Sequence, residues 1–352
     1  MNISQKLLTI IIPTYNMEKY LNRCLDSLIG TEKILPLLEV LVINDGSTDK
    51  SSDIAHEYEL RTPNSIKVMD KANGNYGSCI NLGLKVATGK YVKVLDADDW
   101  FDKTGLEKLI EVLAKVDVDL VLTDFNRVNP KGEVIEKIRF SFPKNKILDI
   151  ECYCCQPEFI AMEMHAVAYR TVMVQENKYH QSEGISYTDV EWIFEPMSYV
   201  KTFYCTGIVV YQYLVGREGQ TVSPSQMSKS LSHTLKGAYA ILNAYSRRFA
   251  ECGRNMRKYL MAKIMIRMNV LYNKTLFLHY LDARELIVLE DYIKEKNKDI
   301  YEATGNLKFY KFLPFYHVRW WRNHGRNSMP EWACVIYKTL LFIKRNIFTI
   351  SK

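Results

Sequence analysis

The chain has 352 residues, of which 47% are hydrophobic and 25% charged, and its formal net charge is +7. This composition excludes a disordered or fibrous protein, and the length predicts either one large domain with additions or two domains. No apolar run reaches transmembrane length, and the short run at 7–12 is not that of a signal peptide. Eight cysteines scattered through apolar stretches are typical of a reducing, cytoplasmic environment.

Strand and helix patterns alternate over the first 125 residues. The predicted strands are 7–12, 40–44, 66–69, 91–95 and 119–124. The predicted helices between them are 17–29, 47–60, 78–87 and 103–115. This alternation predicts an α/β fold, in which a mostly parallel sheet is covered by helices on both faces. Ligands of such sheets bind beyond the carboxyl ends of the strands.

Three polar segments fall at predicted strand ends: PTY at 13–15, DGS at 45–47 and DADD at 96–99. In the last segment Asp96, Asp98 and Asp99 follow a buried strand within four residues. Like charges so close raise one another's pKa unless a positive charge lies between them, and a divalent cation with oxygen ligands is one solution. The alternative is a polar turn in which Asp102 caps a helix that begins near Thr104.

The remainder of the chain is less regular at first and then helical. Residues 125–150 predict a hairpin that turns at 129–132, and 207–214 predicts a late strand. Residues 226–303 are almost wholly helical in pattern. We therefore expect three parts: an α/β domain at 1–225 that carries the polar strand ends, a helical subdomain at 226–306, and a tail at 307–352.

The tail is basic and aromatic. It has nine Lys or Arg residues against one acidic residue, so the preceding body is close to neutral, and it holds three of the five tryptophans. Residues 337–348 are amphipathic at helical spacing, which indicates either contact with an anionic membrane surface or a helix packed on the body. Nucleic acid is not expected as a partner, because no basic groove or binding motif precedes the tail.

Three motifs carry a family resemblance. The segments TIIIPTYNMEKYLNRCLDSL (9–28), EVLVINDGSTDKS (39–51) and GKYVKVLDADDW (89–100) resemble family 2 glycosyltransferases of the GT-A fold, in that order and spacing. The resemblance covers about residues 5–225. It implies a nucleotide-sugar donor, usually a UDP-sugar, a divalent metal such as Mn²⁺ or Mg²⁺, and inversion at the anomeric carbon.

The resemblance also implies an acceptor and a location. The expected acceptor is the hydroxyl of a glycan, a lipid-linked sugar or a cell-envelope polymer. We expect a cytoplasmic enzyme that can associate with the inner face of the membrane through the tail. Neither the sugar nor the oligomeric state follows from the sequence.

The family motifs assign roles to particular residues. Asp98 matches the last carboxylate of the D-x-D motif, a metal ligand, and Asp96 matches the first, which approaches the ribose or the metal. Asp45 matches the acidic residue that accepts a hydrogen bond from uracil, and Asp189 matches the catalytic base. The residues implied in donor binding are Pro13, Thr14, Tyr15, Asp45, Asn73, Asp96, Ala97, Arg217 and Gln220.

Some positions leave alternatives open. Thr188 replaces the glutamate that precedes the base in the family, so Glu191 and Glu183 remain alternative bases. The alternative role for Asp189 is that of a cap on a helix expected over 190–199. Where the family commonly has Arg-Asn, this chain has Ile80-Asn81, so a positive contact to the donor is missing or supplied elsewhere.

Two further side chains have competing interpretations. Arg217, between Gly216 and Gly219, can grip a diphosphate or be a surface arginine. His165 can contact acceptor or metal, although a buried histidine with satisfied hydrogen bonds is the expected state. A noncatalytic sugar-nucleotide-binding protein is the alternative to an enzyme.

Overall fold

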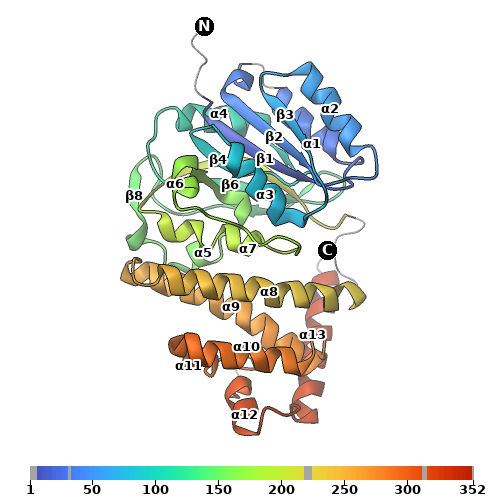
Figure 1. Cartoon of the computed structure of the whole chain (residues 1–352), viewed down its shortest axis with the longest axis vertical. Helices are drawn as coiled ribbons and strands as arrows, with labels where there is room; N and C mark the ends of the chain where they lie inside the picture. Colours follow the sequence, from blue (N-terminus) through green and yellow to red (C-terminus); the bar gives the residue numbers. More distant parts are fainter. Residues whose placement is uncertain (1–5, 31–32, 218–223, 311–314, 351–352) are drawn as a thin grey trace. The chain divides into compact units, whose positions relative to one another are not determined.

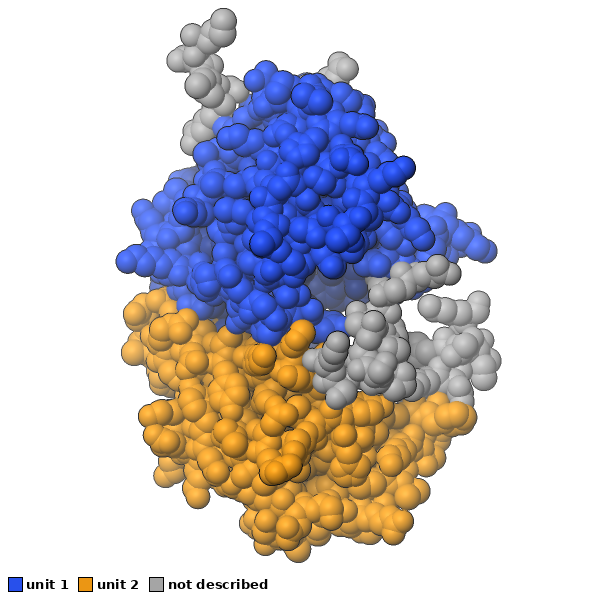
Figure 2. Space-filling view, turned by 45° about the vertical axis from the view of Figure 1, so that its right-hand side comes forward, with its two compact units in different colours: residues 1–220, 252–256 blue, residues 221–251, 257–352 orange. Residues whose placement is uncertain are grey.

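The computed structural model describes residues 6–30, 33–217, 224–310 and 315–350, without the side chains of 224–229 and 344–350. The chain divides into two compact units, shown in different colours in Figure 2. Unit 1 contains residues 1–220 and 252–256, and unit 2 contains residues 221–251 and 257–352.

Unit 1 is built on a ten-stranded sheet (Figure 1). The strands are β1 (Leu8–Thr14), β2 (Leu38–Asn44), β3 (Ile66–Asp70), β4 (Tyr91–Val94), β5 (Trp100–Phe101), β6 (Leu120–Val128), β7 (Val134–Ile138), β8 (Ile147–Asp149), β9 (Val167–Arg170) and β10 (Thr202–Leu214). Their order is β3-β2-β1-β4-β9-β6-β10-β5, with β7 paired to β6 and β8 paired to β10. The expected α/β class is confirmed.

Parallel and antiparallel pairs have separate places in this sheet. The four strands β3, β2, β1 and β4 run parallel, and β6 and β10 form a second parallel pair. Strand β9 lies antiparallel between β4 and β6. Strands β1, β2 and β4 are almost wholly buried, which agrees with their largely apolar sequences.

Helices surround the sheet of unit 1 (Figure 1). They are α1 (Leu21–Ile29), α2 (Ser51–Arg61), α3 (Asn75–Val86), α4 (Lys103–Leu113), α5 (Pro157–Ile160), α6 (Thr171–Glu176) and α7 (Asp189–Trp192). The Asp102 side chain accepts a hydrogen bond from the amide of Gly105 (2.7 Å), so this residue caps α4 as one interpretation of the sequence proposed.

Three short strands were not predicted from the sequence. Strands β5, β8 and β9 have only two to four residues each, too few for a periodic pattern. The hairpin prediction is correct only for β6 and β7, because 147–149 pairs with β10 instead. The helix predicted from about 190 to 199 is wrong: α7 ends at Trp192, and a short 3₁₀ turn begins at Pro196.

Unit 2 is helical, as the pattern of 226–303 predicts. Its helices are α8 (Pro224–Arg248), α9 (Arg254–Leu278), α10 (Ala283–Lys296), α11 (Lys298–Thr304), α12 (His317–Asn323) and α13 (Glu331–Ile350), with the first residues of α9 in unit 1. A buried Glu290 carboxylate accepts hydrogen bonds from Arg322 Nε (2.6 Å) and Nη2 (2.7 Å). This pair joins α10 to α12, so part of the basic tail lies in the core of unit 2.

No helix within the described ranges is both long enough and apolar enough to cross a membrane.

Candidate active site

Polar segments meet at one edge of the sheet in unit 1. Strands β1 and β2 pair in parallel with Thr14 opposite Asn44, and the amide of Asp45 donates to the carbonyl of Thr14 (2.8 Å). Strand β4 lies on the other side of β1 in the same direction, so segment 96–99 reaches the same edge. Because parallel strands end together, the three polar segments come together as the sequence predicts.

Asp45 is held by polar groups of the loop that follows β3. Its side chain is almost buried, and Oδ1 accepts hydrogen bonds from Lys71 Nζ (2.5 Å) and from the amide of Gly74 (2.9 Å). The side-chain amide of Asn73 donates to the carbonyl of Asp45 (3.0 Å). Lys71 also donates to the hydroxyl of Ser78 (2.9 Å). Loop 71–74 therefore holds Asp45 in three ways. Lys71 forms an ion pair with the carboxylate, a backbone amide donates to the carboxylate, and a side-chain amide donates to the backbone carbonyl.

The three residues at the end of β1 differ in accessibility. Pro13 is half-buried, and the hydroxyl of the buried Thr14 donates to the carbonyl of Ile12 (3.2 Å). Tyr15 is 47% exposed. Only the Tyr15 side chain is thus open to a ligand along its length, whereas the hydroxyl of Thr14 is already engaged.

Two carboxylates after β4 are held by tyrosines. Asp96 accepts a hydrogen bond from the hydroxyl of Tyr76 on α3 (2.8 Å). Asp99, which is buried, accepts from the hydroxyl of Tyr211 on β10 (2.7 Å) and from the amide of Leu214 (2.7 Å). The amide of Asp96 in turn donates to the Tyr211 hydroxyl (3.0 Å). The turn is therefore fixed by α3 on one side and β10 on the other.

Asp98 faces a different partner. Its carboxylate forms an ion pair with the guanidinium of Arg217, and its carbonyl accepts from Arg23 (3.0 Å). Ala97, between the two aspartates of the motif, is buried. Arg217 thus lies at the acidic turn, as expected for a diphosphate-binding residue, while the predicted contact of Gln220 lies outside the described residues.

The acidic turn has an excess of negative charge. Burial, assisted by the charge of Asp98, raises the pKa of Asp96 to about 6. Burial and the charges of Asp98 and Asp96 raise the pKa of Asp99 well above its usual range. These shifts are those of carboxylates crowded in a site with too little positive charge, and a bound divalent cation would reverse them.

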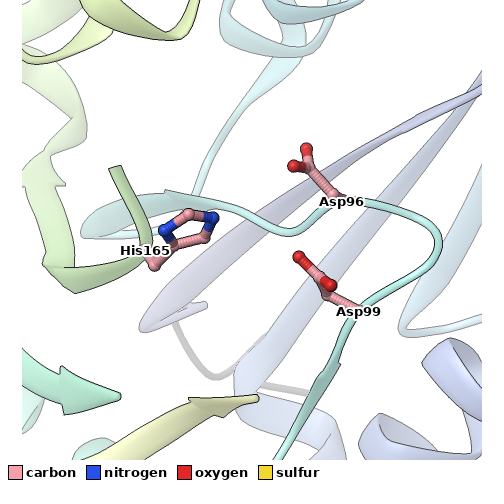
Figure 3. Close-up of side chains that lie close together, drawn as sticks. All are labelled: Asp96, Asp99 and His165. Carbon is pink, nitrogen blue, oxygen red and sulfur yellow. The ribbon is translucent and has the colours of Figure 1, made fainter. Parts of the chain in front are cut away.

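Asp96, Asp99 and His165 form a compact group, drawn in Figure 3. One potential ligand atom from each residue lies within 4.8 Å of the others. His165 is buried, as expected, but its Nδ1 makes no hydrogen bond to any described residue. Two carboxylates and an imidazole are donors that a divalent transition metal accepts, so these residues fit the metal that the resemblance implies.

Asp189 lies near this group on another element. It is the first residue of α7, it is exposed, and it follows the N-cap residue Thr188. Burial is the main cause of the raised pKa of Tyr76 and of Asp96, and the negative charge of Asp189 adds to both shifts, so Asp189 lies within electrostatic reach of the acidic turn. No described residue donates a hydrogen bond to its carboxylate. It therefore does not have the capping role that was the alternative interpretation.

The two alternative bases have structural partners. Glu191 is buried and accepts from the amide of Ser182 (2.9 Å). Glu183 is exposed and accepts from the side-chain amide of Asn81 (2.8 Å). That amide also donates to the carbonyl of Gln181 (2.9 Å), so Asn81 connects α3 to the loop before α7.

Several residues of the site were not found from the sequence. Lys71 had one signal, its position directly after a predicted strand end. Tyr76 and Tyr211 had none, because tyrosine is as common in a glycine-containing loop or a buried strand as in a site. Their roles depend on which elements pack together.

Part of unit 1 is similar to a known protein family. Residues 9–170 match the family described as "Glycosyl transferase family 2". The Minor teichoic acid biosynthesis protein GgaB of Bacillus subtilis is 32% identical over 157 residues, which are 42% of this chain and 17% of GgaB. The chain spans less than half the length of the curated relatives that it matches.

Solved structures show the same fold. TarS of S. aureus (residues 1–349, in complex with UDP-GlcNAc) superposes with a TM-score of 0.64 at 22% identity, covering 84% of this chain and 82% of TarS. The mannosyltransferase PcManGT of Pyrobaculum calidifontis, in complex with GDP-Man and Mn²⁺, has a TM-score of 0.51 at 14% identity and covers 96% and 89%. The expected GT-A class is thereby confirmed.

Proposed function

Since residues 9–170 match the family described as "Glycosyl transferase family 2", we propose that this chain transfers a sugar from a nucleotide-sugar to an acceptor hydroxyl with inversion at the anomeric carbon. The observation that carries the proposal is the meeting of Asp45 and the acidic turn 96–99 at one sheet edge, with Asp189 of α7 within electrostatic reach of that turn. These groups supply a base-recognition residue, anion-binding chemistry and a proton acceptor.

The donor is a UDP-sugar in this proposal. Asp45 is a buried acceptor whose Oδ1 is already held by Lys71 and Gly74, which leaves Oδ2 for a ligand. A carboxylate can accept the imide N–H of uracil, which cytosine does not offer. TarS with UDP-GlcNAc supports this choice, although PcManGT binds GDP-Man. Tyr15 would cover the base or ribose because its ring is exposed beside Asp45.

The acidic turn would bind the diphosphate through a divalent cation, Mn²⁺ or Mg²⁺, which neutralises both the phosphates and the carboxylates. We assign Asp98 and Asp96 as ligands, following the D-x-D motif. Arg217, which pairs with Asp98 in this structure, is placed to donate to diphosphate oxygens and to stabilise the negative charge of the leaving UDP.

Asp189 is the base in this proposal. As the acceptor oxygen bonds to the anomeric carbon, its proton passes to the Asp189 carboxylate and the bond from that carbon to UDP breaks. The exposure of Asp189 leaves room for an acceptor, and Thr188 at the preceding position does not compete for the proton. Glu191 is held by Ser182 and is therefore the poorer candidate.

The acceptor is proposed to be a cell-envelope glycan or a lipid-linked sugar. GgaB, a protein of minor teichoic acid biosynthesis, supports an envelope polymer. Helix α13 would bring the enzyme to an anionic membrane surface, because its exposed side carries apolar residues beside a basic tail.

The experiment that tests this function is thermal unfolding with UDP, GDP, dTDP or CMP, each with Mn²⁺ and again with EDTA. A nucleotide at about a hundred times its dissociation constant adds roughly 2.7 kcal/mol of stability. We expect a shift with UDP and Mn²⁺ that EDTA removes. Absence of a shift with every nucleotide, with and without metal, would contradict the donor assignment.

A further inference from the structure

We propose that His165, together with Asp96 and Asp99, ligates the divalent cation, and that this imidazole makes the site prefer Mn²⁺ to Mg²⁺. This inference rests on the proposed function. It differs from the motif assignment, because Asp98 would then remain the partner of Arg217 and the metal would be held by the acidic turn 96–99 together with His165.

The placement of His165 is the first argument. The side chain is 7% exposed, and Figure 3 shows the outer edge of its ring toward Asp96 and Asp99. The three potential ligand atoms lie within 4.8 Å of one another. No described residue hydrogen-bonds to the outer ring nitrogen, Nε2. This nitrogen, beside two carboxylates and without a hydrogen-bond partner among the described residues, is an open donor position.

The ring is held rigidly in that position. Tyr213 stacks on it with centroids 4.2 Å apart and planes at 23°, and Tyr211 meets it edge-on at 4.8 Å. Lys93, buried on β4, donates from Nζ to the carbonyl of His165 (2.6 Å) and to that of Val167 (3.2 Å). Strand β4 therefore fixes both the carboxylates that follow it and the backbone of His165.

The other ring nitrogen faces a carboxylate. His165 Nδ1 lies 3.2 Å from Glu163 Oε2, within ion-pair distance although not at a hydrogen-bonding angle, and Glu163 is itself paired with Arg127. Metal-binding histidines usually turn their second nitrogen toward a carboxylate, which fixes the tautomer and makes the ligand more basic. The Arg127–Glu163–His165 series has this arrangement, with Asp96 on the metal side.

The ligand set determines the metal preference. Mg²⁺ binds oxygen ligands almost exclusively and keeps several waters, whereas Mn²⁺ also accepts imidazole. A site of Asp98 and Asp96 alone would offer only oxygen and would discriminate little between the two ions. A histidine ligand should favour Mn²⁺ over Mg²⁺. Divalent ions that follow manganese in the first transition row should compete with Mn²⁺ for this site more strongly than Mg²⁺ does.

A spectroscopic experiment tests the ligand directly on the full chain. We would record electron spin echo envelope modulation of the complex with Mn²⁺ and UDP. Modulation from a directly bound imidazole ¹⁴N is expected for the wild type and should disappear in His165→Gln. If the wild type shows no ¹⁴N modulation while Mn²⁺ is bound, His165 is not a ligand and the inference is wrong.

A binding experiment measures the preference. Free Mn²⁺ would be titrated by electron paramagnetic resonance with UDP present, in competition with Mg²⁺. His165→Gln should weaken Mn²⁺ binding at least tenfold and leave Mg²⁺ binding within about twofold. Glu163→Gln should also weaken Mn²⁺ binding, by roughly 10-fold, the lower end of the 10–100-fold range found for outer-shell partners. His56→Gln is the matched control, because His56 is a half-exposed histidine that also contacts two carboxylates, Glu59 and Asp70.

The outcomes separate this inference from the proposed function. If Asp98→Asn abolishes Mn²⁺ binding while His165→Gln binds it normally, the metal belongs to the D-x-D pair; His165 is then not a ligand, and the glycosyltransferase proposal stands. If the chain binds UDP but never binds Mn²⁺, it has no metal site, and both the D-x-D assignment and the role of His165 are wrong. Circular dichroism of each variant confirms that the fold is retained before its affinity is interpreted.

Discussion

At the scale of single residues, Asp189 is the most direct test of chemistry. The substitution Asp189→Asn removes the proton acceptor but keeps the size and the exposed position of the side chain. A positioned general base typically contributes about 10²–10⁴ in rate. We expect the turnover number to fall by roughly that factor while the affinity for UDP with Mn²⁺ stays within twofold. Single-turnover transfer and nucleotide binding would be measured on the same preparation.

The matched control is Glu183→Gln, an exposed carboxylate in the loop before α7. This variant should transfer sugar at a near-normal rate. Normal turnover in Asp189→Asn together with a large loss in Glu183→Gln would move the base to Glu183.

Lys71 offers a second prediction at this scale. Its ammonium group lies 2.5 Å from the buried carboxylate of Asp45, so Lys71→Met leaves that carboxylate without its cation. A hydrogen bond between charged groups contributes about 1.5–3 kcal/mol. We expect the dissociation constant for UDP to rise roughly 10- to 100-fold, measured by calorimetry. Lys67→Met, on the exposed side of β3, is the control.

Lys71 also bears on the missing family arginine near Ile80. The sequence suggested that a positive contact was lost or supplied elsewhere. Lys71 is a cation close to the start of the same helix, since it donates to the hydroxyl of Ser78. Unchanged UDP affinity in Lys71→Met would contradict this assignment and leave the donor site without that positive contact.

At the scale of elements, α13 has two apolar sides. Ala333 and Tyr337 face the interior of unit 2, where the ring of Tyr337 stacks on that of Phe277 at 4.8 Å. The exposed apolar residues recur every three, four or seven positions and so form one stripe along the helix. They are Trp332, Val335, Ile336, Phe342 and Ile343. Packing within unit 2 accounts only for the side of α13 that contains Ala333 and Tyr337. The exposed apolar stripe on its other side therefore supports the membrane proposal.

Sedimentation with vesicles tests this stripe. The double variant Trp332→Ser/Phe342→Ser removes two exposed side chains, each worth about 1.5–3 kcal/mol when buried. We expect binding to vesicles of phosphatidylglycerol and phosphatidylcholine to fall at least tenfold, with UDP affinity unchanged. Val288→Ser, an exposed apolar residue on α10, is the control. Equal vesicle binding by the double variant and the wild type would remove the membrane role of α13.

Substitution is a sharper test than deletion of the tail. Trp321 is buried within unit 2, and Arg322 holds the buried Glu290. Removing 307–352 would leave that carboxylate without its cation and open the helical core, since an unpaired buried charge is strongly destabilising. A loss of vesicle binding after deletion would thus report unfolding as much as membrane contact.

At the scale of the whole molecule, His317 predicts how acid affects stability. Its ring is fully buried between Phe277 and Phe309, and burial lowers its pKa to about 4. In the unfolded chain the pKa is near 6.5, so between pH 6.5 and 4 the unfolded state binds more protons. Stability is then complete above pH 6.5 and is lost as the pH falls toward 4, by up to about 3 kcal/mol.

Chemical denaturation at pH 7.5 and pH 5.0 measures this effect. His317→Phe should lose less stability between the two values than the wild type does, and His324→Gln, an exposed histidine, should behave as the wild type. The same pH dependence in His317→Phe and the wild type would show that other groups cause it. The comparison is informative because neither ring nitrogen of His317 hydrogen-bonds to any described residue.

How far sequence reasoning reached differs between elements. The parallel strands β1, β2 and β4 and the helices α8 to α11 of unit 2 were predicted, because long apolar runs and helical periodicity are local properties. Strand β9 was missed although it lies inside the sheet. Its four residues carry no periodic signal, and pairing with β4 and β6 is what makes them a strand.

The sequence by itself determined the fold class, the edge of the sheet at which the polar segments gather, and the acidic turn 96–99. These follow from patterns and motifs within short segments. Only the tertiary structure decided how the carboxylates are shared, with Asp98 paired to Arg217 and Asp99 beside His165. Such pairings join residues more than sixty positions apart, and only the packing of β4 against β9, and of the acidic turn against β10, brings them within a few ångströms.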